Sequence, residues 1–375
     1  MSDGATKTKT IEGMPVKAGA AGWDVFDVMA EGRHEQLVVW SEPELGYRGI
    51  IAIHDTSMGP ALGGTRFWNY ESDRAAVIDA LRLSRGMTYK AAITGLNLGG
   101  GKSVIWGDNR TKDREMIFRA HGRAVESLQG RYITAEDVGT SPEDMELVAM
   151  ETRHVTGLLG RSGDPSPVTA FGVFRGIKAC AAIAYDNDAL GGKHVAVQGL
   201  GHVGYHLCED LAQEGARLTV TDIYPERVQR VVEAFGAQAV EPNAIYDVDA
   251  DVFAPCALGA VINDDTISRL KVDIVAGAAN NQLASGAVHG PGLHERGILY
   301  APDYVINAGG LINVYGELED WTPARSKRKA GDIYNTLLRI FELAKSEGIP
   351  TETAANRVAE ERLREARHLQ RTYLP

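Results

Sequence analysis

The sequence predicts an α/β protein whose chain forms two domains around a cleft, the second of them a doubly wound parallel sheet. Three observations support this prediction. The 375 residues, of which 44% are hydrophobic, exceed a typical single domain and can fill two cores. Strand-like and helix-like segments alternate strictly from about residue 169 to residue 300, as in a parallel sheet with crossover helices. The segment 161–167, Arg-Ser-Gly-Asp-Pro-Ser-Pro, is rich in helix and strand breakers and places the domain boundary between residues 162 and 163.

The first region begins with a predicted hairpin. Gln36–Trp40 and Tyr47–His54 are β-branched and aromatic runs on either side of Glu42–Gly46, which contains a proline and a glycine. Ser72 can cap the helix that follows, whose apolar residues are spaced to form one broad face. This helix is expected to end near Gly86.

Three lysine and acid candidates lie close to the predicted ends of the next elements. Lys90 follows the first helix, Lys102 leads an apolar strand, and Asp137 stands in the loop after a short strand. A cleft can form where such ends meet. The elements expected here are a strand at 103–106, a helix at 118–128 and a strand at 131–133.

The second region reads as a regular alternation. Val203, Leu207 and Leu211 mark a helix that Gly215 should stop. Two further helices close the chain, one carrying Ile333, Leu337, Ile340 and Ala344 and the other Ala355, Val358, Ala359 and Leu363. The other predicted elements are helices at 169–184 and 225–235 and strands at 194–198, 217–221, 238–240, 251–254, 274–276 and 298–300.

Composition narrows the class of protein. A net charge of −11 and a pI near 5.4 argue against nucleic acid or anionic membrane as the main partner. No apolar run approaches the length of about 20 residues that a spanning helix needs. Residues 1–22 lack the apolar core of a signal peptide and are expected to form a disordered extension. The basic cluster 325–329 is interpreted as a solvated helix face. A cytoplasmic protein is therefore expected.

The cysteines and histidines suggest neither disulfides nor a metal. Cys180, Cys208 and Cys256 are far apart and are interpreted as small buried apolar residues in a reducing compartment. The ten histidines show no metal-ligand spacing, so no metal is expected. His54 is interpreted as a residue near a strand end.

A glycine fingerprint predicts a dinucleotide site. Residues 199–204, Gly-Leu-Gly-His-Val-Gly, directly follow a predicted strand and open a helix. Gly199 would make the tight turn, Gly201 would let the backbone approach the pyrophosphate, and Gly204 would allow close packing of helix on strand. His202 and Val203 complete the loop. Asp222 ends the next strand, where a carboxylate binds ribose hydroxyls and repels a 2′-phosphate. A Rossmann-type domain that binds NAD is predicted.

The lysines and the acid suggest the chemistry. Lys102 follows three glycines, where backbone can close in and exclude water, so its pKa is expected to be depressed and suited to proton transfer near neutrality. Lys90 can keep an ordinary pKa and bind a carboxylate. Solvated lysines and an ordinary surface acid at Glu136 or Asp137 remain the alternative. The residues alone leave open whether these groups share a site.

A series of motifs resembles the amino-acid dehydrogenase family that includes glutamate, leucine, valine and phenylalanine dehydrogenases. The resemblance runs from about His34 to Arg362 and is greatest to the leucine dehydrogenase branch. The matching stretches are 59–66 (Gly-Pro-Ala-Leu-Gly-Gly-Thr-Arg), 85–90 (Arg-Gly-Met-Thr-Tyr-Lys), 99–102 (Gly-Gly-Gly-Lys), 134–139 (Thr-Ala-Glu-Asp-Val-Gly), 165–170 (Pro-Ser-Pro-Val-Thr-Ala), 253–257 (Phe-Ala-Pro-Cys-Ala), 277–281 (Gly-Ala-Ala-Asn-Asn) and 307–310 (Asn-Ala-Gly-Gly).

The resemblance implies a role for each candidate. Lys90 would hold the substrate carboxylate, Lys102 would activate the water that attacks an imino intermediate, and Asp137 would shuttle protons to and from the nitrogen. Positive charge from Lys90 and the cofactor would lower the pKa of Lys102, while Asp137 would oppose that shift. The other implied positions are Thr169 and Asn280 near the nicotinamide and its ribose, and Gly63 and Gly64 near the substrate.

The resemblance also implies a substrate class. In glutamate dehydrogenases a lysine stands where Leu62 stands here, so the distal carboxylate of glutamate would find no partner. Ala135, Leu311 and Val314 match the other side-chain positions and are apolar. This implies reversible, NAD-dependent oxidative deamination of L-leucine and other branched-chain amino acids in their catabolism. An aromatic amino-acid dehydrogenase, and a non-catalytic dinucleotide-binding regulator, are the alternatives.

The resemblance further implies a domain plan and an assembly. Residues 1–162 would form the substrate-binding and oligomerisation domain, to which residues 345–375 would return. Residues 163–344 would form the NAD-binding domain. A homo-oligomer acting on small molecules is expected, with neither nucleic acid nor membrane as a partner.

Overall fold

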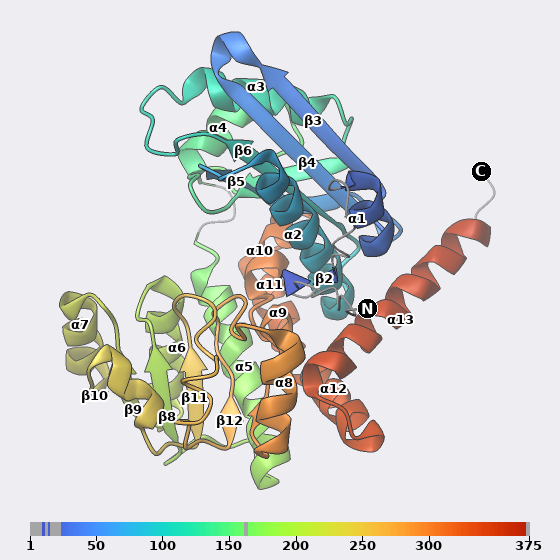
Figure 1. The fold of residues 1–375 in the computed structure, drawn as a ribbon. Helices are drawn as coiled ribbons and strands as arrows, with labels where there is room; N and C mark the ends of the chain where they lie inside the picture. The colour runs from blue at the N-terminus through green and yellow to red at the C-terminus, as the bar shows by residue number, and fades with distance from the viewer. Residues whose placement is uncertain (1–9, 12–13, 16–23, 161–163, 373–375) are drawn as a thin grey trace, which may run out of the picture. The chain divides into compact units, whose positions relative to one another are not determined.

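The computed structural model describes residues 10–11, 14–15, 24–160 and 164–372, which form two compact units of the α/β class (Figure 1). The first unit spans residues 1–163 and 360–375, and the second spans residues 164–359. The C-terminal part of the first unit thus begins at Glu360 and not at residue 345 as expected. The reason is that α12 (Ile333–Glu347) packs against α5 (Ser166–Tyr185) in the second unit.

The N-terminal extension lies mostly outside the described residues. Its described part is a short antiparallel pair, β1 (Thr10–Ile11) and β2 (Met14–Pro15), where a disordered segment was expected.

The first unit is built on a five-stranded mixed sheet with the order β3-β4-β6-β5-β7. The predicted hairpin is confirmed, because β3 and β4 pair antiparallel around a short 3₁₀ turn, η1, that ends at Gly46 in a left-handed conformation (φ 66°). β4 also runs antiparallel to β6, whereas β5 is parallel to both β6 and β7. The bounds are β3 Gln36–Glu42, η1 Pro43–Leu45, β4 Tyr47–Asp55, β5 Ala61–Trp68, β6 Gly99–Trp106 and β7 Tyr132–Glu136.

Helices cover both faces of this sheet. On one face α2 contributes Ala80 and Leu81 to a core with Ile50, Ala52 and Val104 of the strands. On the other face α3 and α4 pack on the alternate strand residues, which include Ile51, Ile53 and Ile105. The bounds are α1 Val25–Gly32, α2 Asp73–Thr94, α3 Glu115–Glu126 and α4 Pro142–Ala149.

The helix that Ser72 begins is longer than predicted. Ser72 does cap α2, since its Oγ accepts a hydrogen bond from the backbone N–H of Ala75 (3.1 Å). The predicted end at Gly86 is wrong, because α2 continues to Thr94 and ends at Gly95 (φ 74°). Its last turns bury Thr88 and residues 91–94, and this packing outweighs the cost of about 1 kcal/mol of a glycine inside a helix. Lys90 therefore lies within a helix and not at a helix–loop junction.

The second unit contains a six-stranded, fully parallel sheet with the order β10-β9-β8-β11-β12-β13. Numbered along the chain, this order is that of the doubly wound dinucleotide-binding fold, so the predicted Rossmann-type sheet is confirmed. The strands are β8 His194–Gln198, β9 Arg217–Thr221, β10 Gln238–Ala239, β11 Val252–Pro255, β12 Ile274–Val275 and β13 Leu299–Tyr300.

The helices of the second unit include those predicted and several that were not. The basic cluster 325–329 lies on α11, where Arg325, Lys327 and Arg328 are exposed as expected. The bounds are α6 His202–Gln213, α7 Pro225–Phe235, η2 Pro242–Asp247, α8 Gly286–Glu295, α9 Asp303–Ile306, α10 Gly309–Leu318, α11 Pro323–Gly331 and α13 Thr351–Thr372, the last of which crosses into the first unit.

One helix has the length and mean hydropathy of a membrane span, although Arg175 and Lys178 interrupt its apolar residues. Among the described residues α5 alone meets that test, with a mean hydropathy of 1.3 over its apolar window. Half of that window is buried inside the protein, and α5 packs against α6, α10, α11 and α12. A core helix passes the same test, and the packing identifies α5 as one.

Candidate functional site

The strand register gathers most of the substrate-site candidates of the first unit on one face of its sheet. Gly64 pairs with Ala135 across β5 and β7, and Thr65 pairs with Ser103, which brings Lys102 beside Gly64. Because side chains alternate along a strand, positions two apart share a face. The positions on the face that α2 covers are Leu62, Gly64, Arg66, Lys102 and Ala135, and Asp137 continues this row two residues beyond Ala135.

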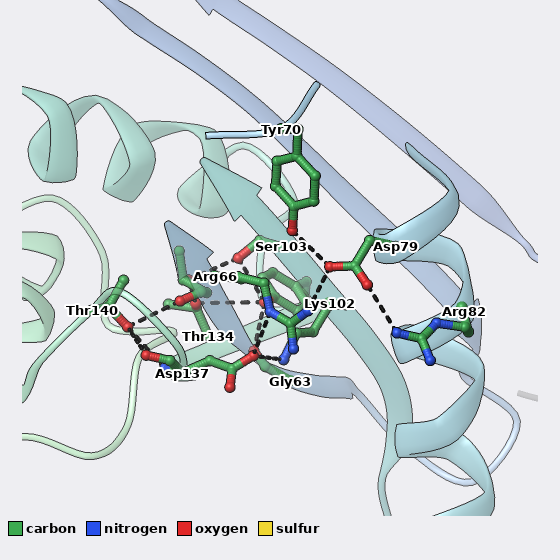
Figure 2. A network of polar contacts seen from close by, with 12 residues as sticks. Gly63, Arg66, Tyr70, Asp79, Arg82, Lys102, Ser103, Thr134, Asp137 and Thr140 are labelled. Carbon is green, nitrogen blue, oxygen red and sulfur yellow. Dashed lines mark hydrogen bonds and ion pairs between the residues drawn. The ribbon is translucent and has the colours of Figure 1, made fainter. Parts of the chain in front are cut away.

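Lys102 and Asp137 form an ion pair at the centre of this face (Figure 2). The Lys102 ammonium donates from Nζ to Oδ2 of Asp137, and only 8% of the Lys102 side chain is exposed. The backbone N–H of Asp137 donates to Oγ1 of Thr140 (2.8 Å), and this hydroxyl donates to the carbonyl oxygen of Thr65 (3.0 Å). The loop after β7 is thereby fixed to β5, and the Asp137 carboxylate is held against Lys102.

Burial and charge shift the pKa of both groups. Burial lowers the pKa of Lys102, with a smaller lowering from Arg66, and the opposing effect of Asp137 does not cancel this. Burial alone would raise the pKa of Asp137, but the charges of Lys102 and Arg66 outweigh it and lower that pKa. The expected depression of the Lys102 pKa is thus present. Its main cause is desolvation, and Arg66 is a positive neighbour that adds to it.

Arg66 belongs to a charge network that the sequence did not reveal. Its Nη1 donates to Oδ2 of Asp79 on α2 (2.7 Å), and its Nε lies 3.6 Å from Oδ2 of Asp137. Tyr70 and Arg82 donate to the Asp79 carboxylate at 2.6 Å and 3.1 Å (Figure 2). The signal available in the sequence was the spacing of Arg66, two residues after Gly64 and so on the same strand face.

The other two candidates of the first unit are Lys90, on α2, and Glu136, at the end of β7. Lys90 is partly buried on α2, whose Thr88 lies against β6 at Gly100. Glu136 is exposed and pairs with Thr65 in the register, so it points to the opposite face from Asp137. Of the two adjacent acids, the structure therefore brings Asp137 to Lys102.

Two glycines allow the strands of this face to lie closely together. A Cβ atom added to Gly63 would be 1.7 Å from the carbonyl oxygen of Gly101, and one added to Gly64 would be 2.4 Å from that of Glu136. Their backbone therefore lies where any side chain would clash. Leu62 and Ala135 beside them are buried, with 2% and 8% of their surface exposed.

The glycine fingerprint in the second unit has the geometry that a dinucleotide requires. Gly199 turns the chain after β8 with φ 95°, and a Cβ atom on Gly204 would be 2.0 Å from the Gly199 carbonyl oxygen. Gly201 stands at the N-terminus of α6, where a Cβ atom added to it would lie 4.0 Å from Nη1 of Arg227 and so would meet no close neighbour among the described residues. An anion can therefore approach the backbone N–H groups and the positive end of α6.

Asp222 directly follows β9 and is firmly held. Its Oδ2 accepts a hydrogen bond from the backbone N–H of Leu200 (2.6 Å) and its Oδ1 one from that of Tyr224 (2.9 Å). Only 6% of its side chain is exposed, and Arg227 Nη1 lies 3.8 Å from Oδ2. A carboxylate that links the fingerprint loop to the end of β9 fits the ribose position of this fold. The nearby Arg227 is a positive charge that no sequence motif indicated.

The other predicted positions of the second unit lie in separate elements. Thr169 is in the first turn of α5 and donates to the Pro165 carbonyl oxygen (2.9 Å), and Asn280 accepts from Nδ2 of Asn307 (2.7 Å). Leu311 and Val314 are one turn apart on α10, where Leu311 is buried and Val314 partly buried. His202 is exposed at the start of α6, with Nδ1 3.3 Å from Oδ2 of Asp164, and Val203 follows it, partly buried.

Cys180 and Cys208 are buried, as expected, whereas Cys256 is only partly buried, and none of the three is reactive. Burial raises the pKa of Cys180, Cys208 and Cys256, the last to about 12, so none of these thiols is activated. Over the residues that the structure describes, no group of three or more histidine, cysteine or acidic side chains could hold a metal ion. His54 lies in β4, buried, and its ring bonds to Thr88 and to the Gly32 carbonyl.

Comparisons with known proteins point to one family. Residues 34–154 match the family model described as Glu/Leu/Phe/Val dehydrogenase, dimerisation domain, and residues 219–371 match Glutamate/Leucine/Phenylalanine/Valine dehydrogenase. Leucine dehydrogenase of Thermoactinomyces intermedius is 56% identical over 93% of this chain and 96% of its own. Leucine dehydrogenase of Bacillus subtilis is 55% identical over 94% and 97%. The crystal structure of L-tryptophan dehydrogenase from Nostoc punctiforme superposes with a TM-score of 0.84 at 46% identity, covering 92% of this chain and 100% of that one.

Proposed function

This chain belongs to the glutamate/leucine/phenylalanine/valine dehydrogenase family, and we propose that it is the NAD-dependent enzyme that oxidatively deaminates L-leucine. As an amino-acid dehydrogenase it is an oxidoreductase. The proposed reaction converts L-leucine, water and NAD⁺ to 4-methyl-2-oxopentanoate, ammonium, NADH and a proton, and it is reversible. Isoleucine and valine would be related substrates.

The observation that carries this proposal is the ion pair of buried Lys102 with partly buried Asp137, on a sheet face that also presents apolar Leu62 and Ala135. A lysine with a depressed pKa can take a proton from water as that water attacks the imino carbon of the substrate. Asp137, held beside it, can carry protons to and from the substrate nitrogen. Lys90 would bind the α-carboxylate as a fixed positive charge, and the backbone at Gly63 and Gly64 would lie against the substrate.

The second unit would hold the cofactor. NAD, when bound, would accept the hydride from the α-carbon of the amino acid. The pyrophosphate would lie on the backbone of Gly199, Gly201, His202, Val203 and Gly204 at the start of α6. Asp222 would accept hydrogen bonds from the ribose hydroxyls, and Thr169 and Asn280 would contact the nicotinamide end.

Cofactor choice gives the first testable prediction. Asp222 is buried and its charge repels a 2′-phosphate, so the wild-type protein should prefer NAD to NADP clearly in kcat/KM. Asp222→Ser should shrink that ratio, because it weakens NAD binding and relieves the repulsion. Arg227, 3.8 Å away, would then be free to pair with the phosphate, so the double variant Asp222→Ser with Arg227→Gln should lose the NADP activity gained.

Steady-state kinetics with both cofactors on the three proteins would check this prediction. Equal kcat/KM for NAD and NADP in the unmutated protein would contradict the role of Asp222. A double variant that keeps the NADP activity of Asp222→Ser would remove Arg227 from that account while leaving Asp222 in place.

An aliphatic substrate is supported by the apolar positions of the site. Leu62 and Ala135 are buried and offer no partner to a charged side chain. Leu311 and Val314 are proposed as further side-chain contacts on the strength of the family resemblance. The relatives named leucine dehydrogenase are 55% and 56% identical to this chain, whereas the tryptophan dehydrogenase structure is at 46%. Leucine is therefore favoured over an aromatic substrate.

We propose further that the protein acts as a cytoplasmic homo-oligomer in branched-chain amino acid catabolism. The family model that matches residues 34–154 is described as a dimerisation domain, which supports an assembly of like subunits. A non-catalytic regulator is disfavoured, because the chain carries Lys90, Lys102 and Asp137 together and the relatives that it matches over most of its length are named dehydrogenases.

Product analysis tests the proposed function directly. Purified protein incubated with L-leucine and NAD should form NADH, ammonium and 4-methyl-2-oxopentanoate in equal amounts. The reverse reaction, with the oxo acid, ammonium and NADH, should form L-leucine. Absence of turnover in both directions, in protein that still binds NADH, would contradict the proposal.

A further inference from the structure

Arg66 lies between the two carboxylates of the site. On one side its Nη1 donates to Asp79, and on the other its Nε lies 3.6 Å from Oδ2 of Asp137, the oxygen that also accepts from Lys102 (Figure 2). The distance of 3.6 Å is that of an ion pair and is too long for a hydrogen bond. The Arg66 Nε–H is buried and has no hydrogen-bond partner among the described residues.

A buried N–H without a partner is rare in proteins and costs stability. Oδ2 of Asp137 lies close enough to satisfy it after a small movement. That oxygen is engaged by Lys102 in the charged state of the pair. A shift of the Asp137 carboxylate by a fraction of the 3.6 Å separation would give Arg66 its hydrogen bond.

The Arg66 guanidinium is held in place by Asp79. Asp79 has both oxygens engaged, Oδ2 by Arg66 and Tyr70 and Oδ1 by Arg82. Asp79 lies on α2 and only 13% of its side chain is exposed. The Arg66 Nε–H can therefore keep its orientation while Lys102 loses and regains its proton.

We propose that Arg66 is a positioning residue. When the Lys102 ammonium gives up its proton, the Nε–H of Arg66 donates a hydrogen bond to the Asp137 carboxylate in its place. The inference rests on the proposed roles of Lys102 and Asp137. Without a second cation, loss of the Lys102 proton would leave the partly buried Asp137 carboxylate without a cationic partner, and this is costly. An arginine stays charged at every working pH, so Asp137 keeps a cationic partner throughout and remains ready to accept a proton from the substrate nitrogen.

The proposed role of Arg66 predicts the direction in which the pH profile of kcat should move when Arg66 is replaced. The charged and titratable groups around the pair are Lys102 on β6, Arg66 on β5, Tyr132 on β7, Asp79 and Arg82 on α2, and Tyr70 before α2. Helix α2, which packs on β6, also carries Lys90. The charge of Arg66 lowers the pKa of Lys102 and that of Asp137. Removing this charge should raise both. Because the base form of Lys102 is the active form, the acid limb of kcat should then move to higher pH.

The test compares Arg66→Gln with the wild-type protein. The acid limb of the kcat profile for leucine oxidation should move up by about one pH unit or more, the usual scale for a charge at this range. At a pH on that limb, kcat should fall about tenfold for each pH unit. NADH affinity should stay unchanged. Arg66→Lys keeps the charge but replaces the planar guanidinium, whose separate N–H groups face the two carboxylates, with a single ammonium, so it should lower kcat with a smaller pH shift.

A matched control removes an arginine from a different ion pair of the same unit. Arg119 on α3 pairs with Glu151 at 2.7 Å, with 34% of its side chain exposed. Arg119→Gln should leave the kcat profile where it is in the wild-type protein. If Arg66→Gln does not fold, the Arg66→Lys variant provides the test. A wild-type kcat and an unchanged pH profile in Arg66→Lys would overturn the inference.

A readout without turnover separates this inference from the proposed function. NMR titration of isotope-labelled lysine, with the Lys102 signal assigned from its loss in Lys102→Ala, follows the Lys102 pKa directly. Arg66→Gln should raise that pKa even if leucine is not the substrate. An unchanged Lys102 titration in folded Arg66→Gln overturns the inference, whereas absence of leucine turnover alone overturns only the proposed function.

Discussion

Replacing Lys102 with alanine should lower kcat for leucine oxidation by about three to four orders of magnitude. This is the scale of losing a general base together with the charge that stabilises the transition state. Lys102 is suited to this role because burial lowers its pKa and because it donates to Asp137 from the middle of β6. NADH binding should change little, since the glycine fingerprint belongs to the other unit.

Lys112→Ala is the matched control for this variant, because Lys112 is exposed on the same unit. Its kcat should equal that of the wild-type protein. Asp137→Asn should resemble Lys102→Ala, whereas Lys90→Ala should also weaken binding of the oxo acid. A Lys102→Ala protein that keeps more than about a tenth of the wild-type kcat would remove Lys102 from the catalytic role, because general-base catalysis is worth at least about 10²-fold.

Leu62→Lys should abolish most leucine activity and is the second large effect. Leu62 is 2% exposed and shares its sheet face with Lys102. A lysine there would bury an ammonium without a partner, beside an existing cation, at a cost of several kcal/mol. At about 1.4 kcal/mol for each factor of ten, the expected loss in kcat/KM is about 10³-fold. The variant should admit glutamate only weakly, since Ala135 keeps that part of the site apolar.

Leu62→Met controls for a change of shape alone. A methionine conserves volume and polarity, so it should cost leucine kcat/KM no more than about tenfold. Steady-state kinetics with leucine and glutamate on the wild-type protein and both variants would check the prediction. Wild-type kcat/KM for leucine in Leu62→Lys would show that this residue does not face the substrate.

The second sheet could be predicted almost entirely from the sequence, because most of its strands alternate with helices; the strict alternation expected fails only between β11 and β12, which have no helix between them. Strands His194–Gln198 and Arg217–Thr221 and helix Pro225–Phe235 have the predicted bounds. In the first unit β5 was missed, because Gly63 and Gly64 weaken the strand pattern although they allow the close packing of its neighbours. Helix α2 was cut short because the packing of its last turns is a tertiary effect that no local pattern shows.

Which residues belong to the site could be predicted from the sequence, but how they are placed relative to one another could not. The glycines before Lys102 suggested a depressed pKa, and the structure gives that direction. The residues alone left open whether Asp137 shares a site with Lys102 or is an ordinary surface acid, because strand alternation places it only once the register is known. The Arg66–Asp79 pair and Arg227 beside Asp222 depend on how separate elements pack, so motifs alone could not reveal them.

The central claim is most directly tested by kcat/KM of the wild-type protein with NAD and, in turn, leucine, isoleucine, valine, phenylalanine and glutamate. One methylene in a hydrophobic pocket is worth about 1–3 kcal/mol in specificity, so valine, with one carbon fewer, should be poorer than leucine by about tenfold to a few hundredfold, and isoleucine, an isomer of leucine, by no more than that. Glutamate should be far poorer, because its distal carboxylate would be buried without a partner. Turnover of glutamate comparable to that of leucine would contradict the account, and a phenylalanine optimum would move the enzyme to the aromatic branch of the family.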